Sequence, residues 1–409
     1  MALTTEDRQL LRALAFELKR VSENPIWSEN KAEWQRHNAL EDGRPLFLVD
    51  QLPWNELDMR CTNEGALISD RYWKSVEIWL RREIWKATNL KTDMVVDPYI
   101  KLRIPYKNSG WGLKGQVTEL KLDAKGDVAS QHMACMINEP EDIEKIKLPV
   151  IEPMPEETEK IRETASELFY DVMPWRLNGD IMHLGAWDTI AYWMGVENIY
   201  IELMDRPEMM HAIMEKMTAG YLSMIDQFTK HRLYDTCENL CHCSQTYMRG
   251  EDDKRPVPAD GWAFGLAQAF TSVSPKITEE FECAYMKRIF PHFRHIYYGC
   301  CDRLDDRMEI VSKLPNVRKI SCSPWSHREA FAEKLPKSII MSNKPSPAFL
   351  AGDSFEEDAV RKDIRRTIAA ARKNGVRLEM ILKDVSTVRY DVPRLQRFCE
   401  IATEEARLS

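Results

Sequence analysis

The sequence predicts a single α/β domain built as a TIM (β/α)8 barrel, preceded by an N-terminal helical extension. Short runs rich in β-branched and aromatic residues occur eight times along the chain. Long amphipathic segments separate the later runs, and alternating strands and helices are typical of parallel β/α units, eight of which close a barrel. The chain has 409 residues, 44% of them hydrophobic, so it can bury a core of this size, and no low-complexity tract or internal repeat interrupts the pattern.

The elements follow in chain order. Residues 1–44 are assigned to the helical extension and residues 45–409 to the barrel, with an excursion near 235–260. The strand candidates lie at 45–51, 94–106, 176–188, 261–270, 295–301, 317–325, 338–347 and 377–387. An apolar helix is predicted at 70–89, and the later helices at 302–314, 327–335, 357–375 and 391–408. The helix at 357–375 ends in Asn374 and Gly375, a pair expected where a helix stops before a strand.

Composition excludes several classes of partner. The net charge is -8, and Lys and Arg are scattered among the acidic residues, so no basic stripe is present for nucleic acid. No apolar run approaches the roughly 18 residues of a membrane span, and the N-terminus lacks a signal-peptide core. The ten cysteines lack the density and spacing of a disulfide framework, which predicts reduced thiols. We therefore expect a cytoplasmic protein, and the sequence leaves a homodimer open.

The residues that close the predicted strands are unusually polar. In a TIM barrel, catalytic side chains lie at the C-terminal ends of the strands. The polar residues at these ends are His183, Asp188, Gln268, Cys300, Cys301, Asp302, Cys322, Ser323, Asn343, Lys344, Asp384 and Ser386. A single His or Asp at such a position fixes a loop by hydrogen bonding as often as it catalyses, so the convergence of the whole set on one mouth is what indicates a site.

From about Pro45 to the C-terminus the chain resembles the uroporphyrinogen decarboxylase superfamily, whose members form a TIM barrel and include the corrinoid-dependent methyltransferases. The resemblance is carried by GLAQAFTSVSPKITEEFECAYMKRIF, YYGCCDRLDDRMEIVSKLPNVRKISCSPW, MSNKPSP and LKDVSTVRYDVPRLQRFCEIA. These motifs cover the fourth to the eighth strands. They are typical of the superfamily and say little about the substrate.

The porphyrinogen decarboxylases differ from this chain at both ends of the barrel. They carry an Arg-rich RQAGRY segment after the first strand and a GHG turn after the last. Here these places read DQLPW (50–54) and KDVST (383–387). Without paired arginines, the mouth lacks the groups that hold several substrate carboxylates through bidentate ion pairs. Porphyrinogen decarboxylation is therefore disfavoured.

The thiol-methylating branch of the superfamily binds zinc through a His-x-Cys after the fifth strand and a Cys after the eighth. In this chain the corresponding positions are Tyr298, Cys300 and Asp384, so one of three ligands is retained. Zinc remains a candidate cofactor with an incomplete ligand set, which His242 or Cys243 of LCHCSQ could complete. The sequence leaves the metal undecided. An ordinary loop or hairpin explains Cys237, Cys241, His242 and Cys243 better than a metal site does, because the cluster lacks a second ligand pair.

A further branch of the superfamily is compatible with the loss of these zinc ligands. The resemblance implies the first methyltransferase of O-demethylation, which moves a methyl group from a methoxylated aromatic donor to the cobalt of a corrinoid (cobalamin) carried by a partner protein. An ether needs a proton or a polarising group at its leaving oxygen. The catalytic candidates are Tyr298, Asp384, His242 and Cys300, and the candidates for substrate binding are His183, Trp187, Phe264, Gln268, Trp325 and Lys344. Two alternatives stay open: a decarboxylase or lyase of the same superfamily, and a catalytically silent subunit of a corrinoid system.

Strand alternation makes a further prediction for the adjacent thiols. If Cys300 points into the barrel mouth, Cys301 should point toward the helix layer and merely fill space. A nucleophilic role for Cys300 is disfavoured, because no activating base stands nearby in the sequence. Lys383, next to Asp384, is interpreted as a structural counter-charge.

Overall fold

The computed structural model describes the whole chain except residues 1–2, 115–116, 122–128, 134, 236–239 and 250–256. The strands are β1 (Leu46–Val49), β2 (Ile100–Arg103), β3 (Tyr106–Asn108), β4 (Val117–Lys121), β5 (Ala129–Met133), β6 (Ile151–Pro153), β7 (Trp175–Asn178), β8 (Met182–Leu184), β9 (Leu240–Cys241), β10 (Ser244–Gln245), β11 (Trp262–Gly265), β12 (His295–Tyr298), β13 (Val317–Cys322), β14 (Ile340–Asn343) and β15 (Leu378–Leu382).

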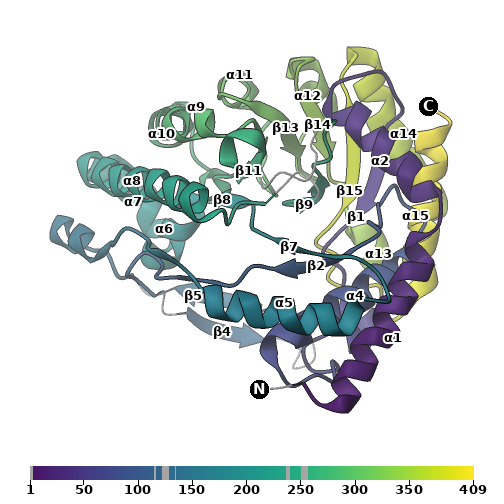
Figure 1. Ribbon diagram of the computed structural model, residues 1–409. Coiled ribbons are helices and arrows are strands. Elements are labelled where there is room, and N and C mark those ends of the chain that lie inside the picture. Colours follow the sequence, from purple (N-terminus) through teal and green to yellow (C-terminus); the bar gives the residue numbers. More distant parts are fainter. Residues whose placement is uncertain (1–2, 115–116, 122–128, 134, 236–239, 250–256) are drawn as a thin grey trace.

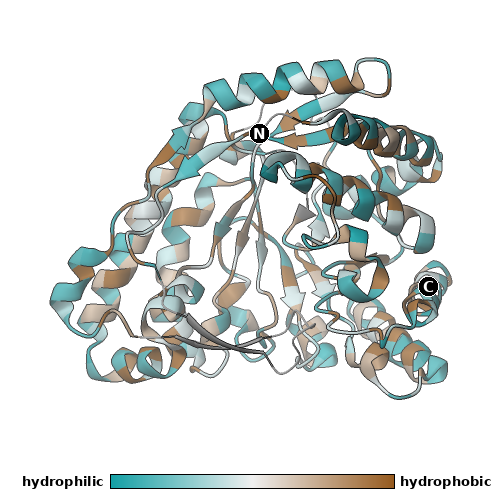
Figure 2. Ribbon diagram, turned by 90° about the horizontal axis from the view of Figure 1, so that it is seen from below, coloured by the Kyte–Doolittle hydropathy of each residue, from teal (hydrophilic) through white to brown (hydrophobic). Residues whose placement is uncertain are grey.

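The α-helices lie mostly outside the strands (Figure 1). They are α1 (Thr5–Ser22), α2 (Ile26–Asn38), α3 (Trp54–Leu57), α4 (Arg71–Asn89), α5 (Pro155–Phe169), α6 (Ala186–Met194), α7 (Val196–Asp205), α8 (Pro207–His231), α9 (Pro275–Thr278), α10 (Ala284–Ile289), α11 (Met308–Val311), α12 (Arg328–Lys334), α13 (Ala348–Ala351), α14 (Glu357–Asn374) and α15 (Val392–Arg407). Figure 2 shows hydrophilic and hydrophobic residues alternating around these outer helices, as expected of helices that cover a buried sheet on one side only. None of the helices in the described part of the chain is long and apolar enough to cross a membrane.

Seven strands form one parallel sheet in the order β1-β15-β14-β13-β12-β11-β8. β2 pairs in parallel with β7, which leads through residues 179–181 into β8. On the other side, the Asp93 N–H donates to the Phe47 carbonyl at 2.8 Å and so joins β1 to the segment that leads into β2. With β7 and β8 counted as one, the strands occupy eight positions around a ring, and the prediction of a TIM-like α/β barrel is confirmed.

Every predicted strand is shorter in the structure than the run that predicts it, and two of the runs are interrupted. The run at 94–106 forms a regular strand only at Ile100–Arg103, because Pro98 and Pro105 cannot donate backbone hydrogen bonds on either side. The run at 176–188 divides into β7 and β8 around Gly179. A Cβ at Gly179 would lie 2.2 Å from the Leu233 carbonyl oxygen, so this close backbone approach requires glycine.

A hairpin formed by β9 and β10 lies inside the ring of barrel strands (Figure 1). Near the start of the barrel strands, Lys319 Nζ donates to Ser244 Oγ at 2.6 Å and to the Gln245 carbonyl at 3.1 Å. At the other end of the barrel, the ring of His242 lies 3.2 Å from Nζ of Lys383, which directly follows β15. The hairpin therefore runs along the barrel axis and presents His242, at its turn, to the C-terminal ends of the strands.

Candidate active site

Three segments meet at the C-terminal mouth of the barrel. Residues 299–301 follow β12, residues 383–384 follow β15, and His242 arrives on the internal hairpin. The structure thus brings together three of the four catalytic candidates, His242, Cys300 and Asp384. No local pattern predicts this arrangement, because His242 lies on a hairpin between α8 and β11 and does not directly follow a barrel strand.

The structure corrects the prediction that Cys301 points toward the helix layer. Its Sγ lies 3.6 Å from Sγ of Cys300 and donates to Asp384 Oδ2 at 3.1 Å. The reason is Gly299, whose positive φ of 87° interrupts the alternation of the strand, so both thiols reach the mouth.

The break in alternation at Gly299 also reverses the directions in which the two tyrosines of β12 point. Tyr298 points away from the mouth: its ring packs against Phe290, and its hydroxyl donates to Glu282 at 3.4 Å. Tyr297 instead points into the barrel, where its hydroxyl accepts a hydrogen bond from Lys344 at 2.6 Å. Tyr298 therefore does not join the other candidates, and Tyr297 is the aromatic hydroxyl that lies beneath the mouth.

Lys383 lies at the centre of the mouth residues. Its Nζ is 3.2 Å from His242 Nε2, 3.3 Å from Cys300 Sγ and 3.8 Å from Cys301 Sγ. It also lies 3.2 Å from Asp384 Oδ2, and its side chain is only 2% exposed, whereas that of Asp384 is 48% exposed. The interpretation of Lys383 as a mere counter-charge to Asp384 does not include these contacts, because three of its partners lie on two segments distant in the sequence.

The contacts set the charges of this cluster. The hydrogen bond from Cys301, together with His242 and Lys383, holds the pKa of Cys300 well below its usual range. The hydrogen bond to Cys300 and burial raise the pKa of Cys301. The pair therefore shares one proton, which Cys301 keeps and can direct either to Cys300 Sγ or to Asp384 Oδ2, while Cys300 is the thiolate.

The pKa values of His242 and Lys383 are both raised by the same two sulfur atoms. Burial lowers the pKa of His242, but the thiols of Cys243 and Cys300 raise it more, to about 9. Burial also opposes the charge on Lys383, and Cys300 and Cys243 again outweigh it and raise its pKa. Because Nζ and Nε2 face each other at 3.2 Å, a stable contact has a proton on one of these two nitrogens, which then donates to the other.

These charges predict a thiolate that persists in mild acid. Ultraviolet absorbance of the thiolate, titrated against pH, should show a signal in the wild type that survives far below the ordinary thiol pKa of about 8.5 and is clearly smaller in Cys300→Ser. Cys301→Ser should retain the signal with a higher midpoint, because it keeps Lys383 and His242 beside Cys300. An identical titration of the wild type and Cys300→Ser would show that Cys300 is an ordinary thiol.

Gly299→Ala should disturb both the barrel and the thiols. The added Cβ would lie 2.5 Å from Leu304 Cδ1, and alanine is strained at a φ of 87°. We expect a loss of about 1–3 kcal/mol in the free energy of unfolding, measured by denaturant titration. Gly43→Ala is the matched control, since its Cβ would meet only Glu33 Oε2 at 3.7 Å. Equal stability of the two variants would contradict the strain argument.

An aromatic wall stands beside the cluster. Phe264 of β11 stacks on the His242 ring with centroids 4.1 Å apart and an interplanar angle of 6°. His183 of β8 contacts the same Phe264 ring edge-on at 5.2 Å, and its side chain is exposed at the mouth. Both belong to the substrate-binding candidates, and the structure places them together next to His242.

The other four substrate-binding candidates lie elsewhere. Trp187 is buried in the helix layer, where its Nε1–H donates to the Phe281 carbonyl at 3.1 Å. Lys344 is buried beneath the mouth, where it also donates to Ser342 Oγ at 2.8 Å. Gln268 is exposed, and its backbone N–H donates to Asp188 at 3.0 Å. Trp325 follows β13 and is 76% exposed. Trp187 is therefore a packing residue, Lys344 organises the interior, and Trp325 is available to a partner.

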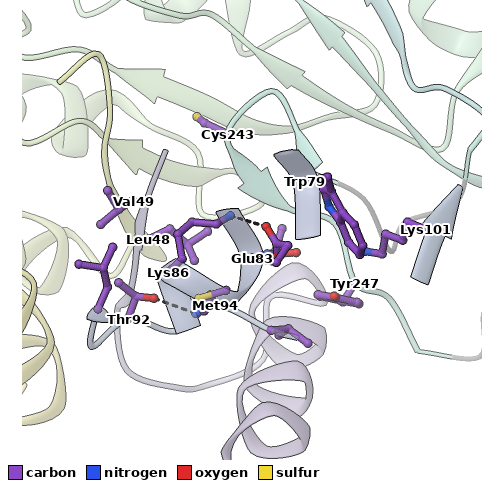
Figure 3. Close-up of a pocket in the computed structure, with 13 residues that line it drawn as sticks. Leu48, Val49, Trp79, Glu83, Lys86, Thr92, Met94, Lys101, Cys243 and Tyr247 are labelled. Carbon is purple, nitrogen blue, oxygen red and sulfur yellow. Dashed lines mark hydrogen bonds and ion pairs between the residues drawn. The ribbon is translucent and has the colours of Figure 1, made fainter. Parts of the chain in front are cut away.

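A second space approaches the hairpin from the side. This pocket of about 250 Å³ is lined from α4, β1, the segment before β2 and the hairpin (Figure 3). Lys86 and Glu83 form an ion pair of 2.5 Å on one side, and Cys243 lies on the hairpin side. No sequence pattern indicates this pocket, because its lining residues are dispersed over about 200 positions.

The residues at the mouth do not fit a zinc ion as they stand. Of the three positions implied by the family resemblance, Tyr298 points away from the mouth. Within the described ranges, no group of three or more His, Cys, Asp or Glu side chains has an arrangement that could hold a metal ion. The donors that do gather at the mouth surround the Lys383 ammonium group instead.

Comparisons with known proteins give a fold and no family. No family model and no curated protein matches the sequence. Among solved structures, the chain matches a methyltransferase from Methanosarcina mazei with a TM-score of 0.54 and 11% sequence identity, over 92% of this chain and 98% of that chain. The two proteins share their fold over nearly their whole lengths.

Proposed function

We propose that the protein is a methyltransferase that takes a methyl group from a small methoxylated aromatic compound and delivers it to the cobalt of a corrinoid on a separate protein. The observation that carries the proposal is the contact between His242 and Lys383, beside an aromatic wall, at the mouth of a barrel. The fold shared with the methyltransferase from Methanosarcina mazei supports methyl transfer as the class of reaction.

The leaving group explains why such a contact is useful. When the bond between the methyl carbon and the ether oxygen breaks, negative charge develops on the oxygen. A positioned proton donor and a fixed cation both lower this barrier. His242 and Lys383 hold at least one proton at their contact through neutral pH, because the neighbouring thiols raise the pKa of both. The pair can therefore hydrogen bond to the phenolate oxygen as it forms and then protonate it.

The aromatic wall gives the donor its orientation. An aryl ring placed against Phe264 and His183 would bring its ether oxygen toward His242, which stacks on Phe264. Holding the oxygen at the acid and the methyl group toward the open mouth is the positioning that a bimolecular transfer requires.

The outer rim of the mouth carries the aromatic side chains that we propose for corrinoid docking. Trp325 and Tyr390, which follow β13 and β15, are 76% and 68% exposed, and such aromatic side chains can contact a flat macrocycle or its carrier protein. When bound, the corrinoid supplies reduced cobalt as the nucleophile. The chain itself orients the donor, excludes water around His242 and stabilises the leaving oxygen.

The proposal is tested under anaerobic conditions. Purified protein is mixed with a reduced corrinoid, free or on a competent carrier protein, and with a panel of methoxylated aromatics, and the cobalt absorption spectrum is followed. Methylated cobalt with release of one phenol per methyl group is the expected result. No spectral change with any donor, with a carrier shown to be competent, would overturn the proposal and favour a lyase or a silent subunit.

A further inference from the structure

We propose that the ammonium group of Lys383 is the resident cation of this site and takes the place that a metal ion would occupy among Cys300, Cys301, His242 and Asp384. The mouth then works without a metal. The inference about the cation stands on geometry alone. Only its consequence for the donor rests on the proposed function.

The contacts of Nζ are those of a central cation. One nitrogen lies between 3.2 and 3.8 Å from a ring nitrogen, two sulfur atoms and a carboxylate oxygen. A lysine ammonium group has three N–H donors and no acceptor, so it can satisfy His242 Nε2, Cys300 Sγ and Asp384 Oδ2 together. The thiol of Cys301 lies beside two of these groups, because its Sγ is 3.6 Å from Cys300 Sγ and 3.1 Å from Asp384 Oδ2.

Lys383 is held in this position. It follows β15, whose five residues are all buried, and its side chain is 2% exposed. A divalent ion among the same donors would stand within a few ångströms of the ammonium group, and at this separation two positive charges repel by several kcal/mol in a partly buried site. A metal could enter only if Lys383 left its partners or lost its proton.

The nature of the cation selects the chemistry. Metal coordination is the means by which a protein holds a substrate thiol as a reactive thiolate. An ammonium group instead donates hydrogen bonds, which suits an oxygen atom that gains negative charge. The site should therefore accept methyl donors whose leaving atom is oxygen and should not activate a thiol as methyl acceptor.

The first test measures the metal content of the wild-type protein. The protein is produced with zinc in the medium, and its metal content is measured by mass spectrometry. We expect no stoichiometric zinc, and we expect a strong chelator to leave methyl transfer unchanged. One bound zinc per chain that Cys300→Ser loses would overturn the inference, whether or not methyl transfer is observed, so the two proposals fail separately.

The second test removes the cation. Lys383→Ala removes the cation from the four side chains that surround it and leaves them free to bind a metal ion. We expect this variant to bind Co²⁺ with the intense sulfur-to-metal absorption that the wild type does not show. The double variant Lys383→Ala/Cys300→Ser is the matched control and should lose that absorption. Cobalt binding by the wild type, or none by a folded Lys383→Ala variant, would show that Lys383 does not take the place of a metal.

Discussion

Glu379→Ala is expected to lower the free energy of unfolding by about 3–5 kcal/mol, because it leaves Lys319 charged and uncompensated inside the barrel. Both side chains are 0% exposed, and Lys319 Nζ donates to Glu379 Oε2 at 2.7 Å. Glu379 also accepts from Ser244 Oγ at 2.9 Å, so its loss loosens the internal hairpin as well. Denaturant unfolding of the purified variant measures the effect.

The controls separate buried from exposed charge. Glu329→Ala breaks an ion pair with Arg366 whose side chains are 50% and 60% exposed, and should cost less than about 1 kcal/mol. The double variant Lys319→Met/Glu379→Leu should recover much of the loss, since it removes both charges. A cost for Glu379→Ala as small as that for Glu329→Ala would contradict the account of the barrel interior.

The same carboxylate sets a pH dependence. Burial opposes its charge, but Lys319 and His37 outweigh burial and lower the pKa of Glu379. A carboxylate with a lowered pKa contributes its full stabilisation above the ordinary Glu value of about 4.3 and loses it as the pH falls toward the folded-state pKa. The stability difference between the wild type and Glu379→Ala should therefore be constant near neutral pH and shrink only in acid.

His242→Asn should reduce the rate of methyl transfer at neutral pH by about 10²–10⁴-fold, the contribution of a positioned general acid. The acid is the proton that Lys383 and His242 hold between Nζ and Nε2, so the wild-type rate should be level at neutral pH and fall in alkali, above the pKa of His242 of about 9. The variant should lack this alkaline decline. Single-turnover measurements across pH, with a saturating carrier, provide both values.

His183→Asn is the matched control, because His183 contacts the same Phe264 ring edge-on and has no described contact to Lys383. It should raise the KM for the aromatic donor while the alkaline decline remains. If His242→Asn kept the wild-type profile, or if His183→Asn abolished the alkaline decline, His242 would not be the acid.

The barrel could be predicted because each of its strands carries a local signal. Buried runs such as HIYY and LEMIL are followed by polar residues and by amphipathic helices, and these patterns do not depend on distant contacts. The breaks at Pro98, Pro105 and Gly179 were also visible in the sequence, but the long runs of apolar residues around them concealed their effect on strand length.

The site was predictable only in part. Cys300 and Asp384 are predictable because they close strands, whereas the sequence offers His242 as a catalytic candidate without indicating that it reaches the mouth. The error over Cys301 and Tyr298 has one cause, since a period of two residues cannot be continued through Gly299 and its positive φ. The central place of Lys383 depends on a hairpin that starts more than a hundred residues earlier, and no local pattern encodes such a contact.

The most direct test of methyl transfer follows the methyl group itself. A donor found in the spectroscopic assay is prepared with a ¹³C-labelled methoxy group, reacted anaerobically with the protein and the reduced corrinoid, and examined by NMR. The account predicts that the label moves to cobalt and that the phenol is released with its ring substituents intact. Label remaining on the aromatic product, with loss of a carboxyl group or another fragment instead, would contradict methyl transfer and identify the protein as a lyase.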